Sequence, residues 1–122
     1  MTAKRLRLYS RLQTAAHRLK KAADKKLMDA AGITTAQAAA LAVINTHGRT
    51  TQRQLAQALS LNESAVSATV SRLKKMELIE RSRRKGDGRM WHLHLTKKGQ
   101  TALQAAEIPF DDINMTIDSV LG

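Results

Sequence analysis

Apolar residues recur at helical spacing along most of the chain, and at alternating spacing over one short segment near residue 93. Residues 4–30 predict one long amphipathic helix, because apolar residues follow three- and four-residue steps at Leu12, Ala16, Leu19, Ala23 and Leu27. Gly32 is the expected stop of this helix.

Three shorter helices are expected next, each preceded by a residue whose side chain caps helices well. Thr34 or Thr35 precedes a helix over residues 36–46, and Thr51 precedes one over residues 52–59. Gln54 stands three residues after Thr51, which is the spacing of a capping box. Asn62 then precedes a helix over residues 63–76.

Two strands and a last helix complete the pattern. Residues 78–82 predict a short strand, and Trp91, Leu93 and Leu95 alternate with histidines as in a half-buried strand. We expect Trp91 to lie in the core beneath the hairpin. The glycines of residues 85–88 suit the hairpin tip. The final helix should begin at Thr96 or Lys97, with Pro109 kinking or interrupting it.

This order predicts a mainly α fold with a small β-hairpin. Two short helices joined by a tight turn and followed by a hairpin form a winged helix-turn-helix, in which a three-helix core carries the wing. A chain of 122 residues suits a single domain. Within residues 1–122 we expect the DNA-binding core at 33–99, with helical segments at 1–31 and 97–122 on either side.

Charge favours a polyanionic partner, with nucleic acid ahead of an anionic membrane. The formal net charge is +11. All 21 Lys and Arg residues and six of the ten acidic residues lie in the first 99 residues, so the net charge there is +15. The remaining segment carries only acidic charges.

Several classes of function find no support in the sequence. The chain has no cysteine, and no segment approaches the about 18 consecutive apolar residues of a membrane span. His92 and His94 share a strand face, a spacing that can chelate metal, but no acidic cluster accompanies them, so we expect no metal site and no cofactor. We find no catalytic arrangement and expect no enzyme activity. A cytoplasmic bacterial protein without membrane contact is the expectation.

The helix over residues 63–76 is the candidate recognition helix. A major groove is about 12 Å wide and admits one helix whose outer face is small or hydrogen-bonding. That face is expected to comprise Ser64, Ser67, Ala68 and Ser71. The alternative is an amphipathic helix with an ordinary solvent face, although such faces are usually richer in Lys and Glu.

Further residues should contact phosphates without reading the sequence. Arg72 and Lys75 lie at the end of the recognition helix, where they would also stabilise its C-terminus. Thr51 and Gln52, at the start of the preceding helix, would offer donors to a phosphate, or would only cap that helix.

The segment over residues 83–89 is the candidate wing. A narrow minor groove attracts arginine through its negative potential. The basic residues expected to reach it are Arg83, Arg84, Lys85 and Arg89. A solvated basic loop is the alternative.

Three stretches together resemble the MarR family of bacterial winged helix-turn-helix transcriptional regulators, over Ile33 to Gly99. The first two are ITTAQAAALAVI and TTQRQLAQALSLNESAVSATVSRLKKMELIER. The third is GDGRMWHLHLTKKG, with an Asp, an Arg two residues on, an apolar strand, Leu-Thr and a glycine. The resemblance implies a sequence-specific regulator of double-stranded DNA, by family precedent a repressor, that binds a near-palindromic operator as a homodimer. By the same resemblance, Asp87 would orient Arg89 in the wing.

The resemblance also implies that the terminal helices form the dimer, through residues that include Leu12, Leu19, Phe110, Ile113 and Ile117. It implies a short member with a truncated C-terminal dimerisation region. The basic first helix and the acidic last segment would complement each other across the axis.

Four positions depart from the family pattern. Ser60 and Met76-Glu77 stand where glycine and Lys-Gly are usual, and Ala38 stands where a bulky aromatic is common, near the cleft for small ligands. The sequence therefore identifies no effector. The alternative function is a winged-helix module that binds DNA non-specifically or binds a protein, with no ligand-sensing role.

Overall fold

The computed structural model describes residues 1–83 and 90–121 of the chain. In order, the elements are α1 (Ala3–Ala31), α2 (Thr35–His47), α3 (Gln52–Leu59), α4 (Glu63–Lys75), β1 (Ile79–Arg83), β2 (Trp91–Leu95) and α5 (Lys97–Leu121). The predicted winged helix-turn-helix is confirmed. Boundaries differ slightly: α4 ends one residue before Met76, which becomes its C-cap, and β1 is displaced by one residue.

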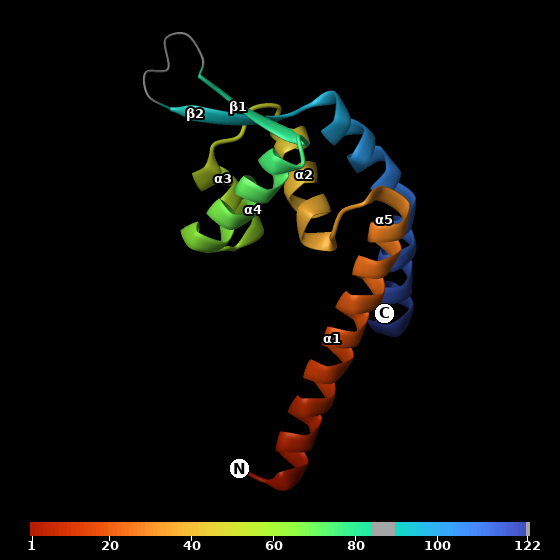
Figure 1. Cartoon of the computed structure of the whole chain (residues 1–122). Helices are drawn as coiled ribbons and strands as arrows, with labels where there is room; N and C mark the ends of the chain where they lie inside the picture. Colours follow the sequence, from red (N-terminus) through yellow and green to blue (C-terminus); the bar gives the residue numbers. More distant parts are fainter. Residues whose placement is uncertain (84–89, 122) are drawn as a thin grey trace.

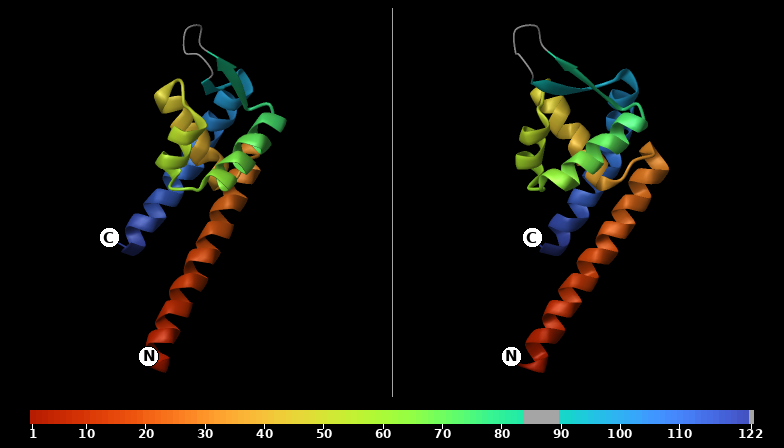
Figure 2. Two further views of the ribbon diagram at one scale, coloured as in Figure 1. Left: turned by 90° about the vertical axis from the view of Figure 1, so that its left-hand side faces the viewer. Right: turned by 60° about the vertical axis from the view of Figure 1, so that its left-hand side comes forward.

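Two structural parts are visible. The helices α2, α3 and α4 lie below the hairpin of β1 and β2, and the hairpin and α3–α4 project to the same side, on the left of Figure 1. The long helices α1 and α5 leave on the other side. The C-terminal half of α1 packs against α5, whereas its N-terminal half extends away from the rest in every view (Figure 2).

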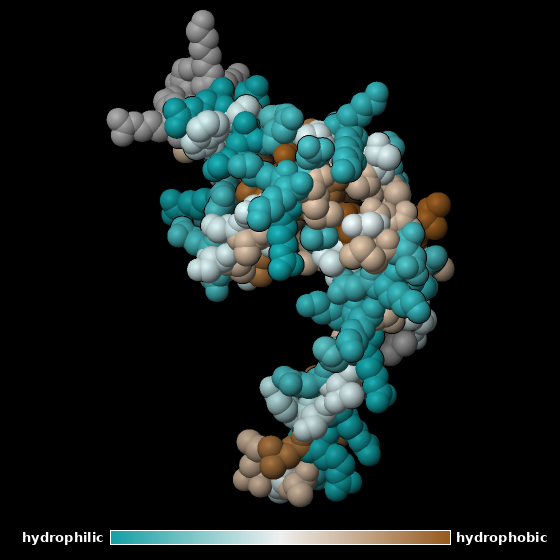
Figure 3. All heavy atoms as spheres, viewed as in Figure 1, coloured by the Kyte–Doolittle hydropathy of each residue, from teal (hydrophilic) through white to brown (hydrophobic). Residues whose placement is uncertain are grey.

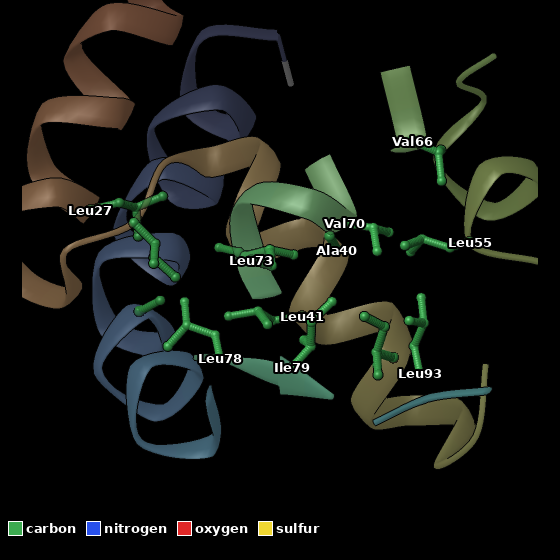
Figure 4. Packing of buried hydrophobic residues seen from close by; sticks show 14 of the residues in the cluster. Leu27, Ala40, Leu41, Leu55, Val66, Val70, Leu73, Leu78, Ile79 and Leu93 are labelled. Atoms are coloured by element: carbon green, nitrogen blue, oxygen red, sulfur yellow. The ribbon is translucent and has the colours of Figure 1, made fainter. Parts of the chain in front are cut away.

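One buried cluster joins these elements (Figure 4). Leu27 of α1, Leu41 of α2 and Leu73 of α4 are fully buried, and Leu55 of α3 and Leu93 of β2 extend the cluster toward the hairpin. Burying a leucine side chain contributes about 1.5–3 kcal/mol, so these contacts hold the short helices together. The cluster thereby fixes the position of α4 relative to the hairpin.

The hairpin has a third backbone partner that the sequence pattern did not predict. β1 and β2 pair antiparallel, with Ile79 opposite Leu95 and Arg83 opposite Trp91. Thr50, just before α3, donates its N–H to the Leu93 carbonyl at 3.2 Å and accepts from the Leu93 N–H at 2.7 Å. This bridge attaches the start of α3 directly to the hairpin.

Helix α1 is buried along only part of its predicted stripe. Ala23 and Leu27 are buried against the core, whereas every residue from Met1 to Ala22 is exposed. Leu12 is 69% exposed and Leu19 is 40% exposed. The apolar face of the N-terminal half therefore has no cover within one chain.

Of the two alternatives predicted for Pro109, a kink or an interruption of the last helix, the interruption is wrong. α5 is assigned as one helix from Lys97 to Leu121 with Pro109 inside it. A proline inside a helix costs about 3 kcal/mol. Here Ala106 before it and Ile113 after it are both buried in the core cluster, and this packing offsets the cost.

A carboxylate in α1 fixes the start of α2. Oδ1 of Asp24 accepts hydrogen bonds from the backbone N–H of Thr35 at 2.8 Å and from its hydroxyl at 2.6 Å. Burial acts to raise the pKa of Asp24, but the two Thr35 hydrogen bonds and the charge of Lys20 outweigh it and leave that pKa below its ordinary value. The ionised form, which makes both bonds, is therefore favoured.

Two non-glycine residues adopt left-handed backbone angles where helices end. Ser60 has φ 54° after α3, and Glu77 has φ 62° after α4. Both positions allow the closing hydrogen bonds of the helix ends, from Leu61 N–H to the Ala56 carbonyl and from Leu78 N–H to the Leu73 carbonyl, each at 3.0 Å. These are two of the positions at which the sequence departs from the family's glycines.

Ser60→Gly and Glu77→Gly should each raise the free energy of unfolding by about 1 kcal/mol, because glycine adopts a positive φ without a Cβ clash. Denaturant unfolding at fixed protein concentration measures the change. Ala58→Gly, at an exposed position inside α3, is the matched control and should lower stability by about 0.5–1 kcal/mol. If all three variants lost stability, the positive φ of Ser60 and Glu77 would not be a source of strain that glycine relieves.

No single helix in residues 1–83 and 90–121 is long and apolar enough to cross a membrane; α1 and α2 pass that test only as a pair bent by 64°.

Candidate nucleic-acid interface

The helix-turn-helix is formed by α3 and α4, which pack through small apolar side chains. Leu55 and Ala56 of α3 are buried, as are Val66 and Val70 of α4 (Figure 4 labels Leu55, Val66 and Val70). The helical period then directs the intervening residues of α4 outward. The four residues of the predicted reading face are all exposed: Ser64, Ser67, Ala68 and Ser71.

A hydrogen bond connects the two helices at this exposed face. Nε2 of Gln52 donates to Oγ of Ser67 at 2.7 Å. The Ser67 hydroxyl hydrogen remains to be donated outward, because the hydroxyl uses only an acceptor position in this bond. Gln52 and Ser67, predicted separately as a phosphate contact and a reading residue, thus lie side by side.

Thr51 is engaged in capping α3. Its hydroxyl accepts from the Gln54 N–H at 3.1 Å, and the Gln54 side chain accepts from the Thr51 N–H at 3.0 Å. The predicted capping box is therefore present. The first amides of α3 and its positive dipole end remain directed away from the helix, beside Gln52.

The basic end of α4 lies toward the hairpin. Arg72 and Lys75 are exposed there, and Lys74 is half-buried. Cations in the last turn stabilise the negative end of the helix dipole, and the exposed pair also remains available to phosphates. On this side of the molecule, teal, hydrophilic surface is mixed with white and tan surface and continues toward the hairpin (Figure 3).

Of the predicted wing residues, Arg83 is described and the others are not. Arg83 is exposed at the end of β1, and its guanidinium carbon lies 4.2 Å from the centroid of the Trp91 ring. Arg84, Lys85, Asp87 and Arg89 lie outside the described residues.

The expectation that Trp91 is a core residue is wrong, since the residue is 44% exposed. The strand alternation is correct, but the core ends at Leu93, which is nearly inaccessible. Trp91 lies two residue pairs nearer the tip than Leu93, past the reach of the helices, and its ring lies against the guanidinium groups of Arg83 and Arg81. Sequence reasoning did not single out Arg81.

The opposite face of the hairpin carries the two histidines. Nε2 of His94 lies 3.3 Å from Oε2 of Glu80, and Nδ1 of His94 lies 3.4 Å from Oγ of Ser82. Within residues 1–83 and 90–121, no three His, Asp or Glu side chains are grouped so that they could hold a metal ion.

A cleft of about 600 Å³ lies between α2 and α5, at the position of Ala38. Its walls are largely apolar, with Val43, Leu103 and Phe110 among them, and Glu107 and Asp111 are its charged lining residues. This size suits a small molecule. Because the lining carries carboxylates and no Lys or Arg, it disfavours an anionic ligand.

The predicted dimerisation residues occupy two different environments. Leu12 and Leu19 are exposed on α1. On α5, Ile113 is buried against the core while Phe110 and Ile117 are partly buried beside it. The α5 residues therefore contribute to the fold of one chain.

Comparison with known proteins agrees with this geometry. The MarR family model matches residues 31–90. The chain is similar to S. aureus MepR in its DNA complex, with 29% identity, a TM-score of 0.81, and coverage of 93% of this chain and 84% of that one.

A MepR F27L mutant bound to an oligodeoxyribonucleotide is 30% identical, with a TM-score of 0.67 and coverage of 91% of this chain and 82% of that one. PcaV from Streptomyces coelicolor, a transcriptional regulator in complex with its natural ligand, is 25% identical, with a TM-score of 0.76 and coverage of 94% and 78%. No curated protein sequence matches the chain.

Proposed function

Because this chain belongs to the MarR family of DNA-binding transcriptional regulators, we propose that it is a repressor that binds a near-palindromic operator as a homodimer. The observation that carries the proposal is the exposed face of α4. It presents three hydroxyls and one methyl group, all small enough to approach base edges in a major groove.

The residues beside this face supply affinity. Arg72 and Lys75 would contact phosphates at one end of α4, while Gln52 and the amides at the start of α3 would contact a phosphate at the other. The wing, at residues 83–89, would enter the adjacent minor groove, with Asp87 holding Arg89 in an extended pose. Residues 33–99 thus form the DNA-binding core.

The dimer is supported by the uncovered half of α1. This helix of 29 residues is about 44 Å long, and helices in proteins gain most of their stability from packing of an apolar face. Apolar side chains exposed on it are Leu6, Leu8, Tyr9, Leu12 and Leu19. Hydrophobic surface gathers near the N-terminal end of α1 in Figure 3, at the bottom of the view. A second copy would cover this surface and bring the basic residues of α1 toward the acidic residues of α5.

Repression, and the relief of repression by an effector, follow from this arrangement. Two α4 helices related by a twofold axis would read half-sites about one helical turn apart, so the bound dimer would occlude the promoter. An effector in the cleft between α2 and α5 would alter the spacing of the two α4 helices. The carboxylates at that cleft favour a neutral or cationic effector.

Selection of duplexes from a random pool, followed by light scattering, tests the function. We expect two chains on a duplex of about 25 base pairs. Affinity for the selected sequence should exceed that for a scrambled duplex by about 1,000-fold or more at the same salt concentration.

A monomer that coats any duplex without fixed stoichiometry would overturn the proposal. That result would favour the alternative, a winged-helix module that binds DNA non-specifically. Binding to no duplex at all would leave protein interaction as the function of the module.

A further inference from the structure

The root of the hairpin carries an exposed aromatic side chain between two arginines. Trp91 is the only tryptophan of the chain and is 44% exposed. The guanidinium carbons of Arg83 and Arg81 lie 4.2 Å and 5.5 Å from the centroid of its ring. Arg83 pairs directly with Trp91 across the strands, so their side chains leave the same face of the hairpin.

Neither arginine has a carboxylate partner among the described residues. The ion pair recorded in residues 1–83 and 90–121 joins Glu80 to His94, on the other face of the hairpin. The indole ring supplies an attraction for both cations. A guanidinium within about 6 Å of an indole centroid is attracted by the negative potential of the ring face.

Further cations border the same region. Arg81 and Trp91 line a hollow of about 750 Å³ together with Lys74 at the end of α4 and Lys97 and Lys98 at the start of α5. The carboxylates of Glu77 and Glu80 line it too. The cations outnumber the carboxylates by two, so the hollow favours an anionic partner.

Stacking leaves the arginines able to bind phosphate. A guanidinium uses its flat face against an aromatic ring, while its N–H donors lie in its plane and point outward. Holding the side chain in an extended pose before binding reduces the entropy lost when a phosphate is contacted. A lysine at either position would lack the planar face and would be held less well.

We propose that Trp91 is a positioning residue that holds Arg81 and Arg83 as a pair of phosphate contacts at the root of the wing. Arg81 then joins the DNA-binding residues, and the phosphate-contacting surface extends from α4 toward the start of α5. This inference rests on the proposed function, because its ligand is the DNA backbone beside the groove that α4 reads.

The test is a double-mutant cycle on DNA affinity, measured with the selected duplex at several salt concentrations. Trp91→Leu should weaken binding about 3- to 10-fold, the range expected for losing stacks of this kind. The slope of log K against log salt should become shallower by about one to two units, because about 0.9 unit is lost with each phosphate contact. Trp91→Phe keeps an aromatic face and should retain most of the affinity.

Removing the arginines should have little further effect once the ring is gone. Arg83→Ala and Arg81→Ala should each weaken binding in the wild-type background, and each should lose much of that effect in the Trp91→Leu background. Met90→Leu, at an exposed neighbour of Trp91, is the matched control and should leave affinity and salt slope unchanged. Circular dichroism establishes that each variant is folded.

Three outcomes would overturn the inference. If Trp91→Leu keeps the wild-type affinity and salt slope, the stack has no role in DNA binding. If the effects of the arginine and tryptophan substitutions simply add, Trp91 does not act through the arginines. If wild-type protein binds no duplex, the proposed function fails together with this inference, and that result is distinct from the other two.

Discussion

Ala68→Glu should lower DNA affinity by about 100-fold or more while leaving the fold intact. Ala68 lies in the middle of the exposed face of α4, between Ser64 and Ser71. A carboxylate there would be brought into the groove between two phosphate backbones, and such like-charge contacts cost several kcal/mol. The residue is exposed and helical, and glutamate is a good helix former, so stability should change little.

The matched control for this variant is Gln104→Glu, on the exposed side of α5. It changes the net charge by the same amount but lies outside the predicted DNA interface, so the DNA affinity of this variant should fall much less. Binding isotherms at one salt concentration compare the two variants. Equal losses in both would mean that net charge, rather than the α4 face, governs binding.

Gly99→Ala should destabilise the protein by about 2–3 kcal/mol, the opposite of what helix propensity predicts. Alanine inside a helix is favoured over glycine by about 1 kcal/mol. At Gly99, however, an added Cβ would overlap the backbone carbonyl of Leu78, which cannot move like the end of a flexible side chain. Overpacking of this kind typically costs 1–3 kcal/mol or more.

The Leu78 carbonyl is held in place from several directions. It accepts from the Thr96 N–H at 3.0 Å, and the Thr96 hydroxyl donates to the Glu77 carbonyl at 2.6 Å. The same hydroxyl accepts from the Gly99 N–H at 3.0 Å and so caps α5. The Leu-Thr and glycine of the wing motif therefore serve one junction, where the start of α5 meets the turn between α4 and β1.

Denaturant unfolding at a fixed protein concentration measures the effect of Gly99→Ala. Gln100→Ala, at the exposed neighbouring position of α5, should be nearly neutral. A Gly99→Ala variant as stable as wild type would mean that the Leu78 carbonyl can move away from residue 99 at little cost in free energy.

The sequence by itself determined the elements and their order, because the signals for these are local. Capping residues predicted the starts of three helices, and the capping box at Thr51 and Gln54 is present as predicted. The three- and four-residue apolar spacing located the helices, and the alternation at residues 91–95 located β2. Spacing within α4 was also enough to separate its buried side from the exposed candidate face.

Only the tertiary structure decided how far the core extends and which atoms surround each backbone segment. Trp91 continues the apolar alternation, but whether it is buried depends on where the helices beneath the hairpin end. Pro109 has the local character of a helix breaker, yet buried residues on both sides keep α5 continuous. The bridge from Thr50 to Leu93 joins segments more than forty residues apart and leaves no local pattern.

Single residues with unusual backbone requirements show the same difference between what local sequence and what tertiary structure determines. Ser60 and Glu77 have positive φ although neither is glycine, because the path from each helix into the next element requires that turn. Gly99 has no positive φ to explain it, and its need for a bare Cα comes from Leu78, which lies in the turn between α4 and β1. Local sequence specifies conformation through side-chain and capping preferences, whereas close approaches and burial depend on atoms that only the folded chain brings together.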